Sequence, residues 1–247
     1  MVDEPDGVPE QPVALLMAGR GLGVPALFGT VANESVIFIY LAFGQGGMSE
    51  AEYLAFVLDA FPLHFGQVLQ HYPASLGGNS SMAAAHLATD LLFTCANRAA
   101  VRGQARPSAP VFLYKFDHPL SFGKAVWGDA THCYHETCHA GELPFLFNPM
   151  AFVNISITPA ERVLAAAMQA YWANFFFTGD PAQGPYAAGL PAPWPAYTAA
   201  ADRSLRITTP ASFVQSGLER SACDFWDTVG YDHGETLLRA LAKRARF

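Results

Sequence analysis

Segments with strand character alternate along this chain with segments of helical character, and that alternation most constrains the fold. Residues 110–117, PVFLYKFD, form the clearest strand pattern. A stretch rich in Ala and Leu at 82–101 predicts a helix before it. Weaker patterns predict short strands at 24–30 and 205–207, irregular structure leading into a helix at 213–229, and a helix at 49–70 that Pro62 should interrupt. Strands alternating with helices favour a layered α/β architecture.

A second long helix has clear signals at both ends. Thr158 at the N-cap, Pro159 at the first helical position and Glu161 two residues later predict its start, and Gly179 predicts its end. We expect its buried face to carry Val163, Ala167, Met168, Tyr171, Trp172 and Phe175.

Composition and charge exclude some partners. Hydrophobic residues make up 51% of the 247 residues, as in a globular protein, and the net charge of −7 argues against a nucleic-acid partner. The longest apolar runs, such as 35–43, are too short to span a bilayer. The first seven residues are acidic and lack the pattern of a signal peptide.

The densest group of reactive side chains lies at 131–142, THCYHETCHAGE. Residues 135–139 match the H-E-x-x-H pattern, in which His135 and His139 would bind zinc, Glu136 would act as general base, and Glu161 could serve as a distant third ligand. That pattern requires a helix, whereas Gly and Pro residues flank this stretch on both sides. The zinc-hydrolase reading is therefore a remote alternative, and we expect neither a metal nor a cofactor.

Several ordered motifs resemble type-B carboxylesterases, the cholinesterase-like family of α/β-hydrolases. The segment CHAGELPFLF resembles that family's histidine loop, and YWANFFFTGDP resembles its helix signature. Three further matches are GTVANES to the loop with the acidic residue, PVFLYKFDH to a family strand and WPAY to a following motif. Together they run in family order up to about residue 229.

The resemblance implies a fold and a pair of catalytic residues. The fold is the C-terminal portion of an α/β-hydrolase, a mostly parallel sheet flanked by helices and lacking the N-terminal strands. Residues 1–230 would form the C-terminal half of one domain, and 231–247 would be a C-terminal tail, in which 239–247 would be a solvated, frayed helix end. Glu34 takes the place of the triad acid and His139 that of the triad histidine, although Asn33 and Ser35 replace the family's Asp and Gly.

The nucleophile of such a triad does not lie in these 247 residues. No serine has glycine at both the −2 and +2 positions, and no His-Gly-Gly segment is present. The resemblance therefore implies that a preceding half supplies the serine and the oxyanion donors. We expect this chain to be inactive alone and poorly soluble, and the complete protein to act on a small-molecule ester.

The resemblance also pairs two of the four cysteines, Cys95 with Cys223, as in secreted members of the family. Cys133 and Cys138 could form a second bridge, or one could remain a thiol beside His139. Disulfides would imply the secretory pathway or the extracellular space. Two other interpretations stay open: a non-catalytic binding or adhesion module, and a truncated gene product.

Overall fold

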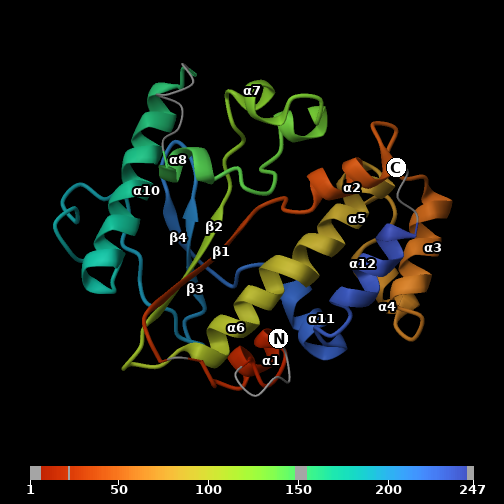
Figure 1. Ribbon diagram of the computed structural model, residues 1–247, viewed down its shortest axis with the longest axis horizontal. Helices are drawn as coiled ribbons and strands as arrows, with labels where there is room; N and C mark the ends of the chain where they lie inside the picture. The colour runs from red at the N-terminus through yellow and green to blue at the C-terminus, as the bar shows by residue number, and fades with distance from the viewer. Residues whose placement is uncertain (1–6, 22, 148–154, 244–247) are drawn as a thin grey trace.

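The computed structural model describes residues 7–21, 23–147 and 155–243. Figure 1 shows a small sheet with the helix α10 on one side and the long helical stretch α5–α6 on the other. The helices are α1 Pro12–Met17, α2 Val36–Phe43, α3 Glu50–Ala60, α4 Phe65–His71, α5 Ser80–Thr89, α6 Cys95–Gln104, α7 Gly123–Trp127, α8 Leu143–Phe147, α10 Pro159–Thr178, α11 Arg220–Val229 and α12 Gly234–Ala242. Three shorter helical segments are η1 Leu76–Gly78, η2 Asp90–Thr94 and η3 Thr131–Tyr134.

In the described chain, the sheet has the order β1 Ala26–Val31, β2 Val111–Phe116, β3 Arg203–Ile207, β4 Phe213–Ser216. The first three strands are parallel, and β4 is antiparallel to β3. This mixed sheet with flanking helices confirms the expected α/β architecture, part of an α/β-hydrolase fold. The short antiparallel strand β4 was not predicted, because irregular structure was expected there.

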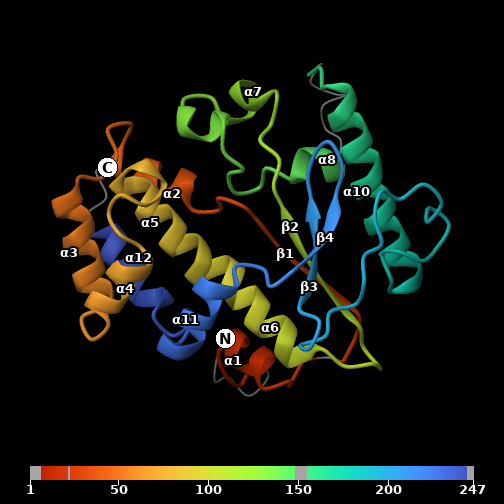
Figure 2. The same cartoon turned by 180° about the vertical axis from the view of Figure 1, so that it is seen from behind.

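Side chains of β2 alternate between the two faces of the sheet, as strand geometry requires. Phe112 and Phe116 pack with Met168 and Tyr171 of α10. On the opposite face Val111 and Leu113 pack with Val101 of α6. The sheet is therefore covered on both faces, as Figure 2 shows from behind.

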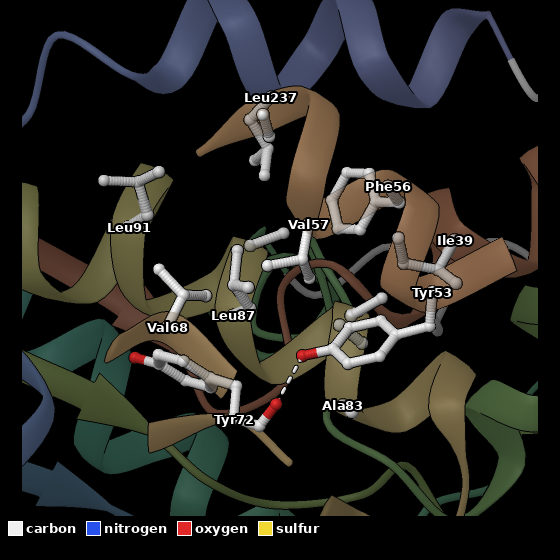
Figure 3. Packing of buried hydrophobic residues seen from close by; sticks show 14 of the residues in the cluster. Ile39, Tyr53, Phe56, Val57, Val68, Tyr72, Ala83, Leu87, Leu91 and Leu237 are labelled. Carbon is white, nitrogen blue, oxygen red and sulfur yellow. Dashed lines mark hydrogen bonds between the residues drawn. The ribbon is translucent and has the colours of Figure 1, made fainter. Parts of the chain in front are cut away.

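A second core lies among the helices beyond α5. Figure 3 shows Ile39, Phe56, Val57, Leu87 and Leu237 converging there from α2, α3, α5 and α12. The hydroxyl of Tyr53 donates a hydrogen bond to the carbonyl of Tyr72 at 2.6 Å within this core. Near the end of the described chain, residues 234–242 form α12, whose Leu237 and Ala240 are buried in this core.

Local signals predicted the ends of α10 correctly. Thr158 and Glu161 form the capping box, and Gly179 adopts the left-handed conformation that ends the helix. The buried stripe is centred on Leu164, Met168 and Tyr171. The prediction was wrong for Val163, which is 62% exposed because it lies about 100° around the helix from Leu164.

The two other predicted helices also form, with interruptions. Pro62 falls in the break between α3 and α4, as expected. The helix expected at 82–101 runs from Ser80 to Gln104, and its middle segment η2 is a π-helix. Among the described residues, no helix is both long enough and apolar enough to cross a bilayer.

Candidate active site

Glu34 lies in the short connection that follows β1, at the carboxyl end of the parallel strands. Its Oε1 accepts hydrogen bonds from the backbone N–H of Val31 at 2.8 Å and from the Thr30 hydroxyl at 3.0 Å. The side chain is only 7% exposed. These bonds fix one carboxylate oxygen and leave Oε2 to face the loop that carries His139.

The structure brings His139 to Glu34 across 105 residues of sequence. Nδ1 of His139 lies 2.5 Å from Oε2 of Glu34. An ionised carboxylate can only accept a hydrogen bond, so Nδ1 carries the proton and Nε2 of the neutral ring becomes the acceptor. The ring is 47% exposed and contacts the aromatic rings of Phe38 and Phe93, with centroids 5.2 Å and 5.6 Å away. The arrangement leaves a proton acceptor open beside an apolar wall.

A disulfide-closed loop positions His139. Cys133 and Cys138 are bonded, which contradicts the alternative of a free thiol beside the histidine. The carbonyl of Thr137 accepts a hydrogen bond from the Asn33 N–H at 3.0 Å, and Asn33 forms an isolated parallel bridge with Cys138. Backbone contacts therefore hold Asn33, which precedes Glu34, against Cys138, which precedes His139.

The two departures from the family's acidic motif have local explanations. The Asn33 side-chain amide donates a hydrogen bond to Glu136, which an Asp at this position could not do. Ser35 has φ −92° and ψ −3°, a conformation that needs no glycine. Its backbone N–H donates to the Thr89 hydroxyl of α5 at 3.0 Å. Both replacements therefore leave the Glu34 carboxylate facing His139.

The zinc reading of 135–139 conflicts with the geometry. The segment follows the short helix η3 and is itself irregular, so His135 and His139 do not share a helix face. Glu161, the suggested third ligand, is fully buried and accepts hydrogen bonds from Ser121 and Thr158. No group of three or more His, Cys, Asp or Glu side chains could hold a metal ion in the parts of the chain that the structure describes.

Glu142 is a third acidic residue at the site, and the sequence had indicated it only as part of a motif. Its Oε2 is buried without a hydrogen-bond partner among the described residues. Burial raises the pKa of Glu142, and the nearby Glu34 carboxylate raises it further, whereas His139 lowers it. The sequence shows that Glu142 lies three residues after His139. It could not show that the Glu142 side chain is buried, because burial depends on tertiary packing.

The second disulfide lies away from this pair. Cys95 at the start of α6 is bonded to Cys223 of α11, which is the pairing that the resemblance implied. Both sulfur atoms belong to fully buried residues, and the bond joins the sheet-covering helix to the helical core.

Comparison with known proteins agrees with the fold and the motifs. The sequence model described as Carboxylesterase family matches residues 1–226. The chain belongs to the carboxylesterase family. Its relatives include the cAMP-regulated D2 protein of Dictyostelium discoideum, 29% identical over 92% of this chain, and Carboxylesterase 5A of Felis catus, 28% identical over 88%. Para-nitrobenzyl esterase of Bacillus subtilis is 29% identical over 78% of the chain.

This carboxylesterase-family chain covers only part of each relative. It spans 41% of the D2 protein, 40% of Carboxylesterase 5A and 36% of para-nitrobenzyl esterase.

Proposed function

We propose that the complete protein hydrolyses carboxylic esters of small molecules, with Glu34 and His139 as acid and base of a Ser–Glu–His triad. The observation that carries this proposal is the 2.5 Å contact between His139 Nδ1 and Glu34 Oε2. The serine and the oxyanion donors come from a part of the protein that precedes these residues, and this chain alone is inactive.

The geometry suits the two proton transfers of such a reaction. Nε2 of His139 takes the serine proton as the hydroxyl oxygen attacks the ester carbonyl, and then returns that proton to the departing alkoxide. An acyl-serine remains, and a water molecule attacks it by the same route, with Nε2 accepting the water proton and returning it to the serine. The neutral imidazole can therefore accept a proton on Nε2 and release it again within one catalytic cycle.

Glu34 supports this cycle without being protonated. It holds the imidazole in the tautomer whose Nε2 accepts, and it stabilises the imidazolium that forms. Its other oxygen is held by Val31 and Thr30, so the carboxylate cannot rotate away without losing two hydrogen bonds. Two buried disulfides are compatible with a protein that folds in the secretory pathway, which we propose as its location.

Hydrolysis of p-nitrophenyl acetate by the complete protein tests the proposal. Both His139→Ala and Glu34→Gln should lower kcat by on the order of 10³-fold or more, because triad members act as a unit. His135→Ala is the matched control, since it changes a neighbouring exposed histidine and should retain activity.

Three outcomes would contradict the proposal. Loss of activity in His135→Ala together with chelator sensitivity would restore the zinc-hydrolase alternative. Full activity in His139→Ala would remove the proposed base. A folded complete protein without esterase activity would favour the non-catalytic binding module instead.

A further inference from the structure

A cavity of about 550 Å³ lies among α4, α5, η2 and the segment that joins β4 to α11. Its wall includes Tyr72, His86 and Asp90 from the helical side and Glu219 and Arg220 from the start of α11. Neither Glu34 nor His139 lines it. The volume suits a small organic molecule.

The other charged residues of this wall contact groups of opposite charge. Lys115 forms an ion pair with Glu219 at 2.6 Å. Arg220 lies 3.4 Å from the buried Asp202, which forms a closer ion pair with Arg98 at 2.6 Å, and Arg98 also lies 3.3 Å from Asp224. No ion pair connects Asp90 to a basic side chain within the described residues. Asp90 is thus the carboxyl group of the wall whose charge the described chain leaves unbalanced.

A hydrogen-bond chain holds one carboxylate oxygen of Asp90 in place. The indole N–H of Trp226 donates to the Tyr72 hydroxyl at 2.8 Å, and that hydroxyl donates to Asp90 Oδ2 at 2.9 Å. Figure 3 shows the Tyr72 hydroxyl on the side away from Tyr53. Among the described contacts, Oδ1 of Asp90 has no donor, so one carboxylate oxygen is left for a bound molecule.

The protonation states favour a positively charged ligand. Burial raises the pKa of Asp90 to about 7, and the Glu219 carboxylate also raises it. The hydrogen bond from Tyr72 and the positive charge of Lys115 lower this pKa. Burial and then Lys115 lower the pKa of His86, so its ring is neutral at pH 7. The wall therefore offers acceptors and aromatic rings, and a cation beside Asp90 would favour its ionised form.

Two backbone irregularities coincide with this wall. Asp90 begins the π-helix η2, and such segments often occur at functional sites. Glu219 has φ +43° and ψ 43°, a left-handed conformation that is strained for a residue with a Cβ. The residues at these two irregularities, Asp90 and Glu219, both line the cavity.

We propose that this cavity binds a small organic monocation, such as a primary ammonium, through Asp90 with the rings of Tyr72 and His86 beside it. The site is separate from the proposed ester hydrolysis and does not depend on it.

Calorimetric titration of the complete protein with benzylammonium, and with benzyl alcohol as the neutral analogue of similar shape, tests this proposal. Benzylammonium should bind more tightly than the alcohol. Its affinity should rise up to about tenfold between pH 6 and pH 8, because the ionised fraction of a carboxyl with a pKa near 7 rises from about a tenth to about nine tenths. The ammonium itself stays charged throughout this range.

Asp90→Asn should abolish both the preference for the ammonium and the pH dependence. The amide keeps the size of the carboxyl and can still accept from Tyr72, and it removes a charge that burial disfavours, so the variant should melt no lower at pH 8. Asp129→Asn, which changes an exposed carboxylate, should bind as the parent does.

Equal binding of the two probes, or an affinity that does not change between pH 6 and pH 8, would overturn the proposal even if Asp90→Asn fails to fold. Unchanged ammonium binding in a folded Asp90→Asn variant would overturn it as well, as would the absence of any benzylammonium binding.

Discussion

Glu161 fastens the start of α10 to the loop that follows β2. It accepts hydrogen bonds from the backbone and hydroxyl of Ser121 and from those of Thr158, and it lies 3.1 Å from a ring nitrogen of His118. Burial raises the pKa of Glu161, but these donors lower it more, to about 2. The residue that the zinc pattern had offered as a ligand is therefore a structural carboxylate.

Glu161→Gln should destabilise the fold at neutral pH by on the order of 3 kcal/mol, which corresponds to the depression of this pKa below its ordinary value. The contribution is fully present above pH ~5 and is lost as the pH falls through the folded-state value near 2. Urea unfolding of parent and variant at pH 7, 4 and 2.5 should show a difference that shrinks toward acid.

Glu52→Gln is the matched control for that change. Glu52 holds the equivalent position in the capping box of α3, where its hydrogen bonds to Ser49 are exposed to solvent. Glu52→Gln should lower the free energy of unfolding by less than about 1 kcal/mol, since exposed hydrogen bonds contribute little. Equal losses at the two positions would show that burial of Glu161 adds nothing.

At the scale of single elements, Gly179 decides how α10 ends. Its φ is +76°, and a Cβ on it would lie 3.0 Å from Cγ of Pro25. Gly179→Ala should therefore cost about 1–2 kcal/mol, from left-handed strain together with a contact to the segment before β1. Unfolding free energies from urea titration measure this loss.

Gly66→Ala provides the opposite case. Gly66 lies in α4, and a Cβ there would meet no atom within 4 Å. Because Ala favours the helix by up to about 1 kcal/mol, this substitution should be neutral or stabilising. A similar loss in both variants would contradict the strain argument for Gly179.

The elements differ in how far local sequence determines them. The ends of α10 could be predicted because Thr158, Pro159 and Gly179 act on their own helix. The strand β4 could not, since its four residues depend on pairing with β3. The π-helix η2 has no local pattern of its own. In the candidate site, resemblance supplied Glu34 and His139, whereas the isolation of Glu142 arises only from burial in the folded loop.

At the scale of the whole molecule, β1 is the edge of the sheet in the described chain. The N–H groups of Ala26 and Ala32 donate to carbonyls of the β2 segment. Because these groups alternate along a strand, the N–H of Phe28 faces β2 and that of Leu27 faces the open edge. An open strand edge can pair with another chain and so promote aggregation. Exposed aromatic residues add to this tendency, since Phe176 is 79% and Phe177 71% exposed on α10.

We therefore expect the 247-residue chain to self-associate unless a polypeptide that supplies the preceding strands is co-expressed. Light scattering after size-exclusion chromatography should show a monodisperse complex only with that partner. Leu27→Pro should reduce association of the chain alone, because proline removes an N–H that makes no bond to β2 and hinders a new strand. Phe28→Pro should instead unfold the sheet, since it removes a bond to β2. A monomeric parent chain with a single cooperative melting transition would show that the open edge is harmless, and equal effects of the two prolines would contradict the assignment of that edge.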